Sequence, residues 1–202
     1  DTLDELMSIC RQHNLLLFSD EVYRCLEYCD DDTLPAACDL YENAVSLGVM
    51  SKTYGLAGLR IGWIATRNQS IYQAMAEFKD FTSICNSAPS EFLSMVALRQ
   101  RDQIIQRNRA IIAANIEICD RFFAKYAERF SWTAPKGGST AFPRLKQAED
   151  VEEFCINLVY KTGVLLLPST YFDYGNQHFR MGLGRKNLPE CINKLDEYLQ
   201  AN

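Results

Sequence analysis

The chain has 202 residues, of which 48% are hydrophobic and 23% charged, so it is long enough to bury a full core as a globular protein. Its formal net charge of −5 argues against general binding to nucleic acid or to an anionic membrane, because both partners favour a basic surface. No apolar stretch has the length of a membrane span, and the first residues lack the pattern of a signal peptide. We therefore expect a cytoplasmic protein.

The chain opens with an amphipathic pattern and then a short apolar run. Apolar residues recur at helical spacing over 3–10, and residues 15–18 are continuously apolar. A helix followed by a fully buried strand is typical of an α/β fold. A second strand is predicted over 44–49, and a third over 59–65 after a glycine-containing turn.

The pattern becomes helical from about residue 71, and a long amphipathic helix is predicted after residue 91. Later segments alternate between short strands and helices, which suggests a second domain. The expected elements are strands over 130–133 and 140–145, a helix over 151–161, strands over 164–167 and 179–183, and a helix beginning near residue 187. We place the domain boundary within the long helix, dividing residues 1–115 from 116–202.

Eight cysteines are scattered through apolar segments, which favours buried free thiols in a reducing compartment over a disulfide framework. Cys25 and Cys29 form a CxxxC pair beside three aspartates, a pattern that raises the question of a metal site. The chain has two histidines and no second close pair of cysteines, so we expect no metal.

Lys52 is the most informative residue, because it lies between an apolar strand and a glycine-rich turn. Burial there, with a guanidinium nearby, would disfavour the charged amine and make it nucleophilic. Arg60 follows in the same segment, while Asp20 and Tyr23 follow the first predicted strand and Arg180 lies in a later one. In order and spacing, this set resembles the fold type I pyridoxal-phosphate (PLP) enzymes, and most closely the class I/II aminotransferases.

The resemblance runs through nearly the whole chain and implies an α/β fold. Residues 1–115 would form the C-terminal part of a PLP-transferase-like large domain, with a mostly parallel sheet and helices. Residues 116–202 would form a small α+β C-terminal domain.

The resemblance also implies a role for each residue of the cofactor set. Lys52 would hold pyridoxal 5'-phosphate as a Schiff base, and Asp20 would keep its pyridine nitrogen protonated. Tyr23 would donate a hydrogen bond to the phenolic oxygen of the cofactor, and Arg60, aided by the hydroxyl of Ser51, would bind its phosphate. Without the rest of the pattern, Lys52 would be read as a solvated lysine and Asp20 as a helix N-cap.

Arg60 is expected on a mostly buried strand, because apolar residues surround it. Many relatives carry a serine or threonine as a phosphate ligand where this chain has Val49, so phosphate binding would depend more on Arg60, Ser51 and backbone amides.

The resemblance also places Arg180 at the position of the family's arginine that binds the substrate α-carboxylate through a two-point fork. Arg185 is a nearby alternative, and a surface ion pair is a simpler explanation for Arg180. The segment 168–172 departs from the Pro-Gly turn that is frequent in relatives. Three aromatic residues near Arg180 fit either a pocket or plain packing; they are Tyr171, Phe172 and Tyr174.

The function implied is transfer of an amino group between an L-amino acid and a 2-oxo acid, by a protein that is a homodimer when full length. Alternatives on the same scaffold are a decarboxylase, a lyase, a cyclising enzyme, or the PLP-sensing domain of a transcription regulator. The enzymes that this sequence resembles have chains about twice as long. We therefore expect residues 1–202 to be the C-terminal part of a longer protein, with an incomplete sheet. Alone, residues 1–202 are expected to bind PLP weakly without turnover.

Overall fold

The computed structural model describes residues 2–146 and 150–201. The chain divides into two compact units, residues 1–105 (unit 1) and residues 106–202 (unit 2). The division falls within the long helix α5 (Arg101–Lys125). The boundary that we placed at residue 115 remains a prediction about domains.

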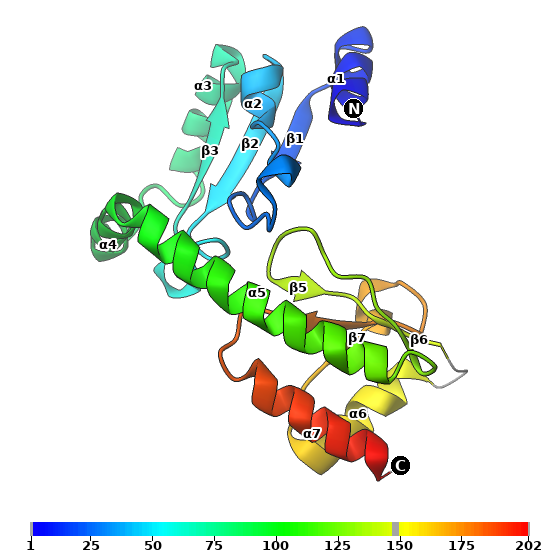
Figure 1. Cartoon of the computed structure of the whole chain (residues 1–202). Helices are drawn as coiled ribbons and strands as arrows, with labels where there is room; N and C mark the ends of the chain where they lie inside the picture. The colour runs from blue at the N-terminus through cyan, green and yellow to red at the C-terminus, as the bar shows by residue number, and fades with distance from the viewer. Residues whose placement is uncertain (1, 147–149, 202) are drawn as a thin grey trace. The chain divides into compact units, whose positions relative to one another are not determined.

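Unit 1 is built on a three-stranded sheet with β2 in the middle (Figure 1). β1 pairs with β2 in parallel, with Leu17 opposite Ala44, and β3 pairs with β2 in the antiparallel sense, with Ile64 opposite Leu47. The strands are β1 (Leu17–Asp20), β2 (Ala44–Val49) and β3 (Gly62–Thr66). The helices are α1 (Thr2–Gln12), α2 (Ala37–Leu40), α3 (Gln69–Asp80) and α4 (Ala88–Arg99), with short 3-10 turns η1 (Asp30–Asp32) and η2 (Ala57–Leu59).

Local chemistry explains where several of these elements begin and pack. α1 carries acidic residues in its first turn and Arg11 in its last, which suits the helix dipole. Its buried face packs against α2 and β2, where Met7, Cys10 and Ala44 share one cluster. α3 is capped by Asn68, whose side chain accepts a hydrogen bond from the backbone N–H of Ile71 at 3.1 Å.

Two predictions for this unit were wrong in part. The third strand begins at Gly62, not at residue 59, because a 3-10 turn and a left-handed residue precede it. It is also not mostly buried, since Trp63 is 42% and Ile64 47% exposed. The long helix predicted after residue 91 is two helices, α4 and α5, which meet at the non-helical Gln100.

Unit 2 has two small antiparallel sheets backed by helices. One sheet has the order β5-β8-β7, and the other pairs β4 with β6. The strands are β4 (Phe130–Ser131), β5 (Thr140–Ala141), β6 (Arg144–Leu145), β7 (Leu167–Pro168) and β8 (Phe179–Gly182). The helices are the main part of α5, α6 (Val151–Thr162) and α7 (Leu188–Gln200), with the 3-10 helix η3 (Ser169–Phe172).

Unit 2 closes around an aromatic core. Phe130 contacts Phe154 and Phe179 with ring centroids 6.1 and 6.0 Å apart, and all three side chains are at most 2% exposed. α6 is capped by Asp150 at its start and ends at Gly163, where φ is +76°, a value that glycine adopts without strain. The strand predicted over 164–167 is shorter and later than expected, because β7 pairs with β8 only at residues 167–168.

Most predicted elements are confirmed within one to three residues, and the α/β class of the fold is confirmed. The expectation of buried thiols was only partly right. Four cysteines are buried, Cys191 is intermediate, and Cys25, Cys29 and Cys85 are exposed. No helix among residues 2–146 and 150–201 is both long and apolar enough to cross a bilayer.

Candidate cofactor and substrate site

Asp20 and Tyr23 lie in the turn that leaves β1, which we call the Tyr23 turn (residues 20–24). The exposed carboxylate of Asp20 accepts a hydrogen bond from the backbone N–H of Val22 at 3.3 Å, so this side chain shapes the turn that it begins. Tyr23 is half-buried, and its carbonyl accepts a hydrogen bond from the N–H of Leu26 at 2.9 Å. The aspartate is thus not a helix N-cap.

Lys52 lies in the turn that leaves β2, which we call the Lys52 turn (residues 50–56). The turn is fixed by backbone bonds, with the N–H of Met50 donating to Ile61 at 3.0 Å and the N–H of Leu56 donating to Met50 at 2.9 Å. Gly55 has a φ of +67°, which allows the chain to turn back here. Because β1 and β2 are parallel neighbours, their carboxyl ends bring the Lys52 turn beside the Tyr23 turn.

The amine of Lys52 lies over the ring of Tyr23. Its Nζ atom is 5.7 Å from the centroid of that ring, within the range of a cation–π contact. The side chain of Lys52 is exposed, so the expected burial of this lysine was wrong for the residues that the structure describes. An accessible amine is able to meet an aldehyde that enters from solvent.

Arg60 does not lie on a strand, contrary to the prediction. It is the left-handed residue that ends η2, with φ of +55°, and its exposed guanidinium donates a hydrogen bond to the carbonyl of Ala57 at 3.2 Å. Ser51 is half-buried between Met50 and Lys52. Both residues belong to unit 1. Among the residues that the structure describes, no side-chain hydrogen bond joins either of them to Lys52.

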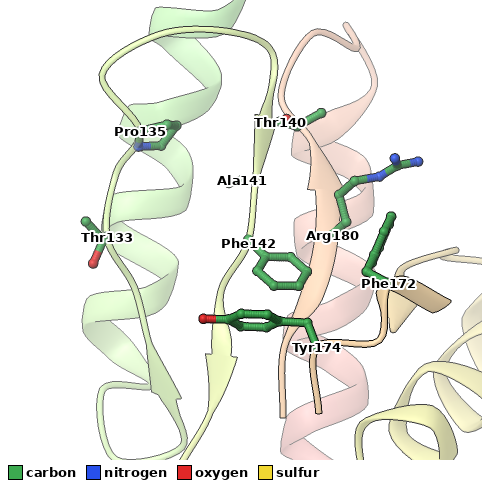
Figure 2. Close-up of a pocket in the computed structure, with 8 residues that line it drawn as sticks. All are labelled: Thr133, Pro135, Thr140, Ala141, Phe142, Phe172, Tyr174 and Arg180. Carbon is green, nitrogen blue, oxygen red and sulfur yellow. The ribbon is translucent and has the colours of Figure 1, made fainter. Parts of the chain in front are cut away.

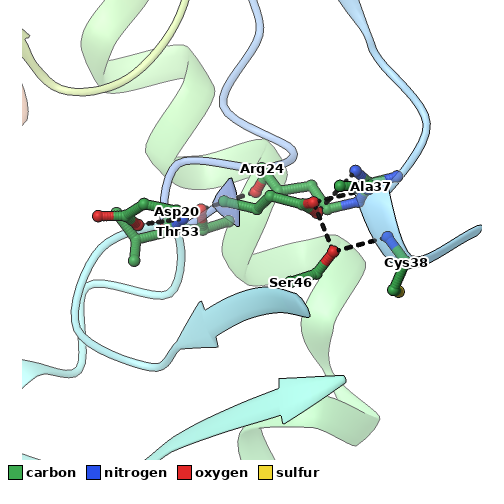
Figure 3. A network of polar contacts seen from close by, with 8 residues as sticks. Asp20, Arg24, Ala37, Cys38, Ser46 and Thr53 are labelled. Atoms are coloured by element: carbon green, nitrogen blue, oxygen red, sulfur yellow. Dashed lines mark hydrogen bonds and ion pairs between the residues drawn. The ribbon is translucent and has the colours of Figure 1, made fainter. Parts of the chain in front are cut away.

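A polar network joins the Tyr23 turn to β2 and α2, and our prediction from sequence missed it (Figure 3). Glu21 accepts hydrogen bonds from the hydroxyl of Ser46 at 2.7 Å and from the backbone N–H of Ala37 at 2.9 Å. It also forms an ion pair with Arg24 at 3.2 Å. The signals in the sequence were an acidic pair at the end of a strand and a serine within an apolar strand, neither of which identifies its partner.

In unit 2, Arg180 borders an open cavity of about 550 Å³ whose lining includes three aromatic rings (Figure 2). Its guanidinium lies 5.5 Å from the centroid of Phe172. Phe142 meets the ring of Phe172 edge-on at 6.0 Å and that of Tyr174 at 5.7 Å. A cavity of this size with one exposed cation suits an anion that carries an apolar part.

Two of the three aromatic residues that we singled out, Phe172 and Tyr174, line this cavity, while Tyr171 is 71% exposed and is not among its lining residues. Phe142 was missed, because its position in a predicted strand gave no indication of the face it occupies. His178 stacks on Phe142 at a centroid distance of 5.0 Å. Burial and the nearby charge of Arg144 lower the pKa of His178.

Residues 1–195 match the model of the family described as aminotransferase class I and II, and the chain belongs to this family. It is 28% identical over 180 residues to capreomycidine synthase of Streptomyces vinaceus, covering 89% of this chain and 45% of that protein. It is 27% identical to an aspartate aminotransferase of Thermococcus kodakarensis, covering 97% and 51%.

Among solved structures, a PLP-dependent aminotransferase from Streptococcus suis 89-1591 superposes with a TM-score of 0.90 at 29% identity, covering 98% of this chain and 52% of that one. The chain therefore spans about half the length of the relatives that it matches. The expected family and fold are confirmed, and PLP is the cofactor of this family.

The groups in unit 1 fit PLP chemically. An accessible primary amine, a carboxylate and a phenol come from the ends of two adjacent strands, as an aldehyde-bearing pyridine requires. The exposed guanidinium of Arg60 is a suitable donor for a phosphate.

Proposed function

We propose that this chain provides cofactor-binding and substrate-binding residues of a PLP-dependent aminotransferase that moves an amino group between an L-amino acid and a 2-oxo acid. The observation that supports the proposal best is the position of the Lys52 amine, 5.7 Å from the ring centroid of Tyr23 in the turn that Asp20 begins. Membership of the class I and II family supports the same reaction class.

When bound, PLP supplies an aldehyde and a ring that stabilises the electrons left on the substrate. The Nζ atom of Lys52 would hold that aldehyde, and the free amine of Lys52 would serve as the general base toward the proton on the substrate Cα. The carboxylate of Asp20 would keep a proton on the ring nitrogen. The hydroxyl of Tyr23 would donate a hydrogen bond to the ring oxygen, and Arg60 with Ser51 would bind the phosphate.

We assign recognition of the substrate carboxylate to Arg180, because its exposed guanidinium offers two parallel donors. The rings that line the cavity beside it would contact an apolar or aromatic substrate side chain. Arg180→Lys should raise the KM for amino-acid and oxo-acid substrates about tenfold or more, because a lysine cannot form the fork. Arg185→Lys is the matched control, and a larger effect there would transfer the role to Arg185.

A second candidate is another PLP reaction, favoured by the likeness to a protein named capreomycidine synthase. The experiment that separates the two uses the protein as its gene encodes it, incubated with PLP and pairs of amino acids and oxo acids. Exchange of the amino group supports the aminotransferase. Ammonia, carbon dioxide or a cyclised product without exchange would support the second candidate and contradict our proposal.

We also propose that residues 1–202 alone bind PLP weakly and do not turn over, because the chain spans about half the length of its relatives. A titration that found tight binding by this segment would overturn that. The complete protein is proposed to be a homodimer in the cytoplasm. The family resemblance supports the dimer, and eight free cysteines support a reducing compartment.

A further inference from the structure

A buried hydroxyl joins the Lys52 turn to the Tyr23 turn. Thr53 directly follows Lys52, and its side chain is only 3% exposed. Its Oγ1 atom donates toward the carbonyl oxygens of Arg24 at 2.7 Å and Val22 at 3.1 Å. These two carbonyls belong to the residues on either side of Tyr23, so the hydroxyl is bonded to the backbone that carries the tyrosine.

The Tyr23 turn is itself fixed to β2 at a second place. The hydroxyl of Ser46, on β2, donates to the carboxylate of Glu21 at 2.7 Å and accepts from the backbone N–H of Cys38 at 3.1 Å. Figure 3 shows Thr53 beside Asp20 at one end of this network, and Ser46 between the Tyr23 turn and Cys38 toward the other end. Two hydroxyl groups, on β2 and on the turn that follows it, therefore hold the Tyr23 turn in addition to the backbone bond from the N–H of Glu21 to the carbonyl of Leu47 at 3.1 Å. One of these hydroxyls is adjacent to Lys52.

This arrangement matters because a lysine side chain has a flexible four-carbon stem. Its amine can be placed accurately only if the backbone beneath it is fixed. The backbone bonds of Met50 and Leu56 fix the Lys52 turn within itself and to the segment before β3. The Thr53 hydroxyl adds a link between that turn and the residues that face the amine.

We propose that Thr53 is a positioning residue, whose buried hydroxyl holds the amine of Lys52 in register with Tyr23 and Asp20. This inference rests on the proposed function. A displacement of about 1 Å between reacting groups is enough to cost about a hundredfold in rate, so a single well-placed hydrogen bond can affect the chemistry. Thr53 would not itself touch the cofactor or the substrate.

The test uses the protein as its gene encodes it and three variants. Thr53→Val removes the hydroxyl while keeping the shape, and Thr53→Ser restores a hydroxyl. Thr66→Val is the matched control, because the hydroxyl of Thr66 donates to the carbonyl of Ala44 at 2.8 Å in the same sheet but away from the two turns. Three quantities are measured: the Kd for PLP, the pH midpoint of the absorbance band of lysine-bound PLP, and the melting temperature without PLP.

We expect Thr53→Val to weaken PLP binding about tenfold, which corresponds to the loss of one buried hydrogen bond, and to shift the pH midpoint of the absorbance band. Thr53→Ser should recover both quantities to within about threefold of wild type in Kd. Thr66→Val should lower the melting temperature as much as Thr53→Val does, yet leave the Kd and the pH midpoint unchanged.

A Thr53→Val protein with the Kd and pH midpoint of wild type, and only a lower melting temperature, would overturn the inference while leaving the proposed function intact. If Thr53→Val does not fold, Thr53→Cys decides, because a thiol is a weaker donor. A Kd for Thr53→Cys that is higher than that of wild type supports the inference, and an unchanged Kd overturns it. Failure of wild type itself to bind PLP would overturn the proposed function as well.

Discussion

The two units differ in how far they bury their own apolar side chains. In unit 2, Phe130, Phe154 and Phe179 are at most 2% exposed and contact one another. In unit 1, Phe18 on β1 is 56% exposed and Phe92 on α4 is 60% exposed. Exposed apolar surface of this extent is typical of a surface that contacts another polypeptide.

The proposed substrate arginine and the proposed cofactor lysine therefore lie on scaffolds that differ in how well they are packed. Arg180 lies on β8, whose buried residues Phe179 and Met181 belong to the core of unit 2. We therefore expect unit 2 to fold without contacts from another polypeptide. Lys52 lies in a unit whose sheet is covered at Gly48 by the indole of Trp63 on one face, while Phe18 on the other face is 56% exposed. We therefore expect unit 1 to gain order and stability from contacts that the chain of residues 1–202 does not supply.

The largest expected effect compares two phenylalanines of opposite exposure. Phe179→Ala should lower the free energy of unfolding by about 3–5 kcal/mol, because it removes a fully buried ring from the core of unit 2. Phe81→Ala, at a side chain that is 87% exposed, should change it by less than about 0.5 kcal/mol. Urea denaturation of both variants checks the pair, and equal losses would mean that Phe81 is covered in solution.

A smaller effect is expected at the packed face of the unit 1 sheet. A Cβ atom built on Gly48 would lie 2.4 Å from the indole of Trp63, so Gly48→Ala forces the tryptophan to move. We expect a loss of about 1–3 kcal/mol, the usual cost of overpacking. Gly58→Ala is the control, because nothing lies within 4 Å of its Cβ position. A Gly48→Ala variant with the free energy of unfolding and the tryptophan fluorescence of wild type would show that Trp63 does not cover this face.

The smallest effect is a pH dependence confined to unit 2. Burial, with a smaller effect from Arg144, lowers the pKa of His178 below its ordinary 6.5. The unfolded chain therefore binds a proton more readily, and this contribution to stability is present above pH 6.5 and lost as the pH falls through the folded pKa. The loss should stay below about 1 kcal/mol because solvent screens the group.

Replacing the histidine tests the assignment. His178→Gln should flatten the pH dependence of the melting temperature of unit 2 between pH 7 and pH 5. An unchanged profile in His178→Gln would mean that another group titrates.

The sequence was a good guide to the strands and to the residues at their ends. Asp20 and Lys52 each follow an apolar run, and parallel strands bring their carboxyl ends together, so the proximity of the two turns follows from local patterns. The family resemblance added the chemistry that these residues share.

Other features could not be predicted, because they depend on contacts between distant residues. The exposure of Lys52 and Trp63 depends on what covers the sheet, and a residue's own neighbours in the chain do not reveal that. The left-handed backbone of Arg60 arises from a 3-10 turn that an apolar pattern concealed. The bonds from Thr53 to the carbonyls of Val22 and Arg24 join segments about thirty residues apart.

The central claim is that the amine of Lys52 holds PLP, and one measurement tests it directly. The protein as its gene encodes it is incubated with PLP, reduced with borohydride, digested, and analysed by peptide mass spectrometry. The account predicts a single pyridoxyl group on the peptide that contains Lys52, absent in Lys52→Ala and retained in a control such as Lys186→Ala. Labelling that is spread over exposed lysines, or that persists in Lys52→Ala at the same level, would contradict it.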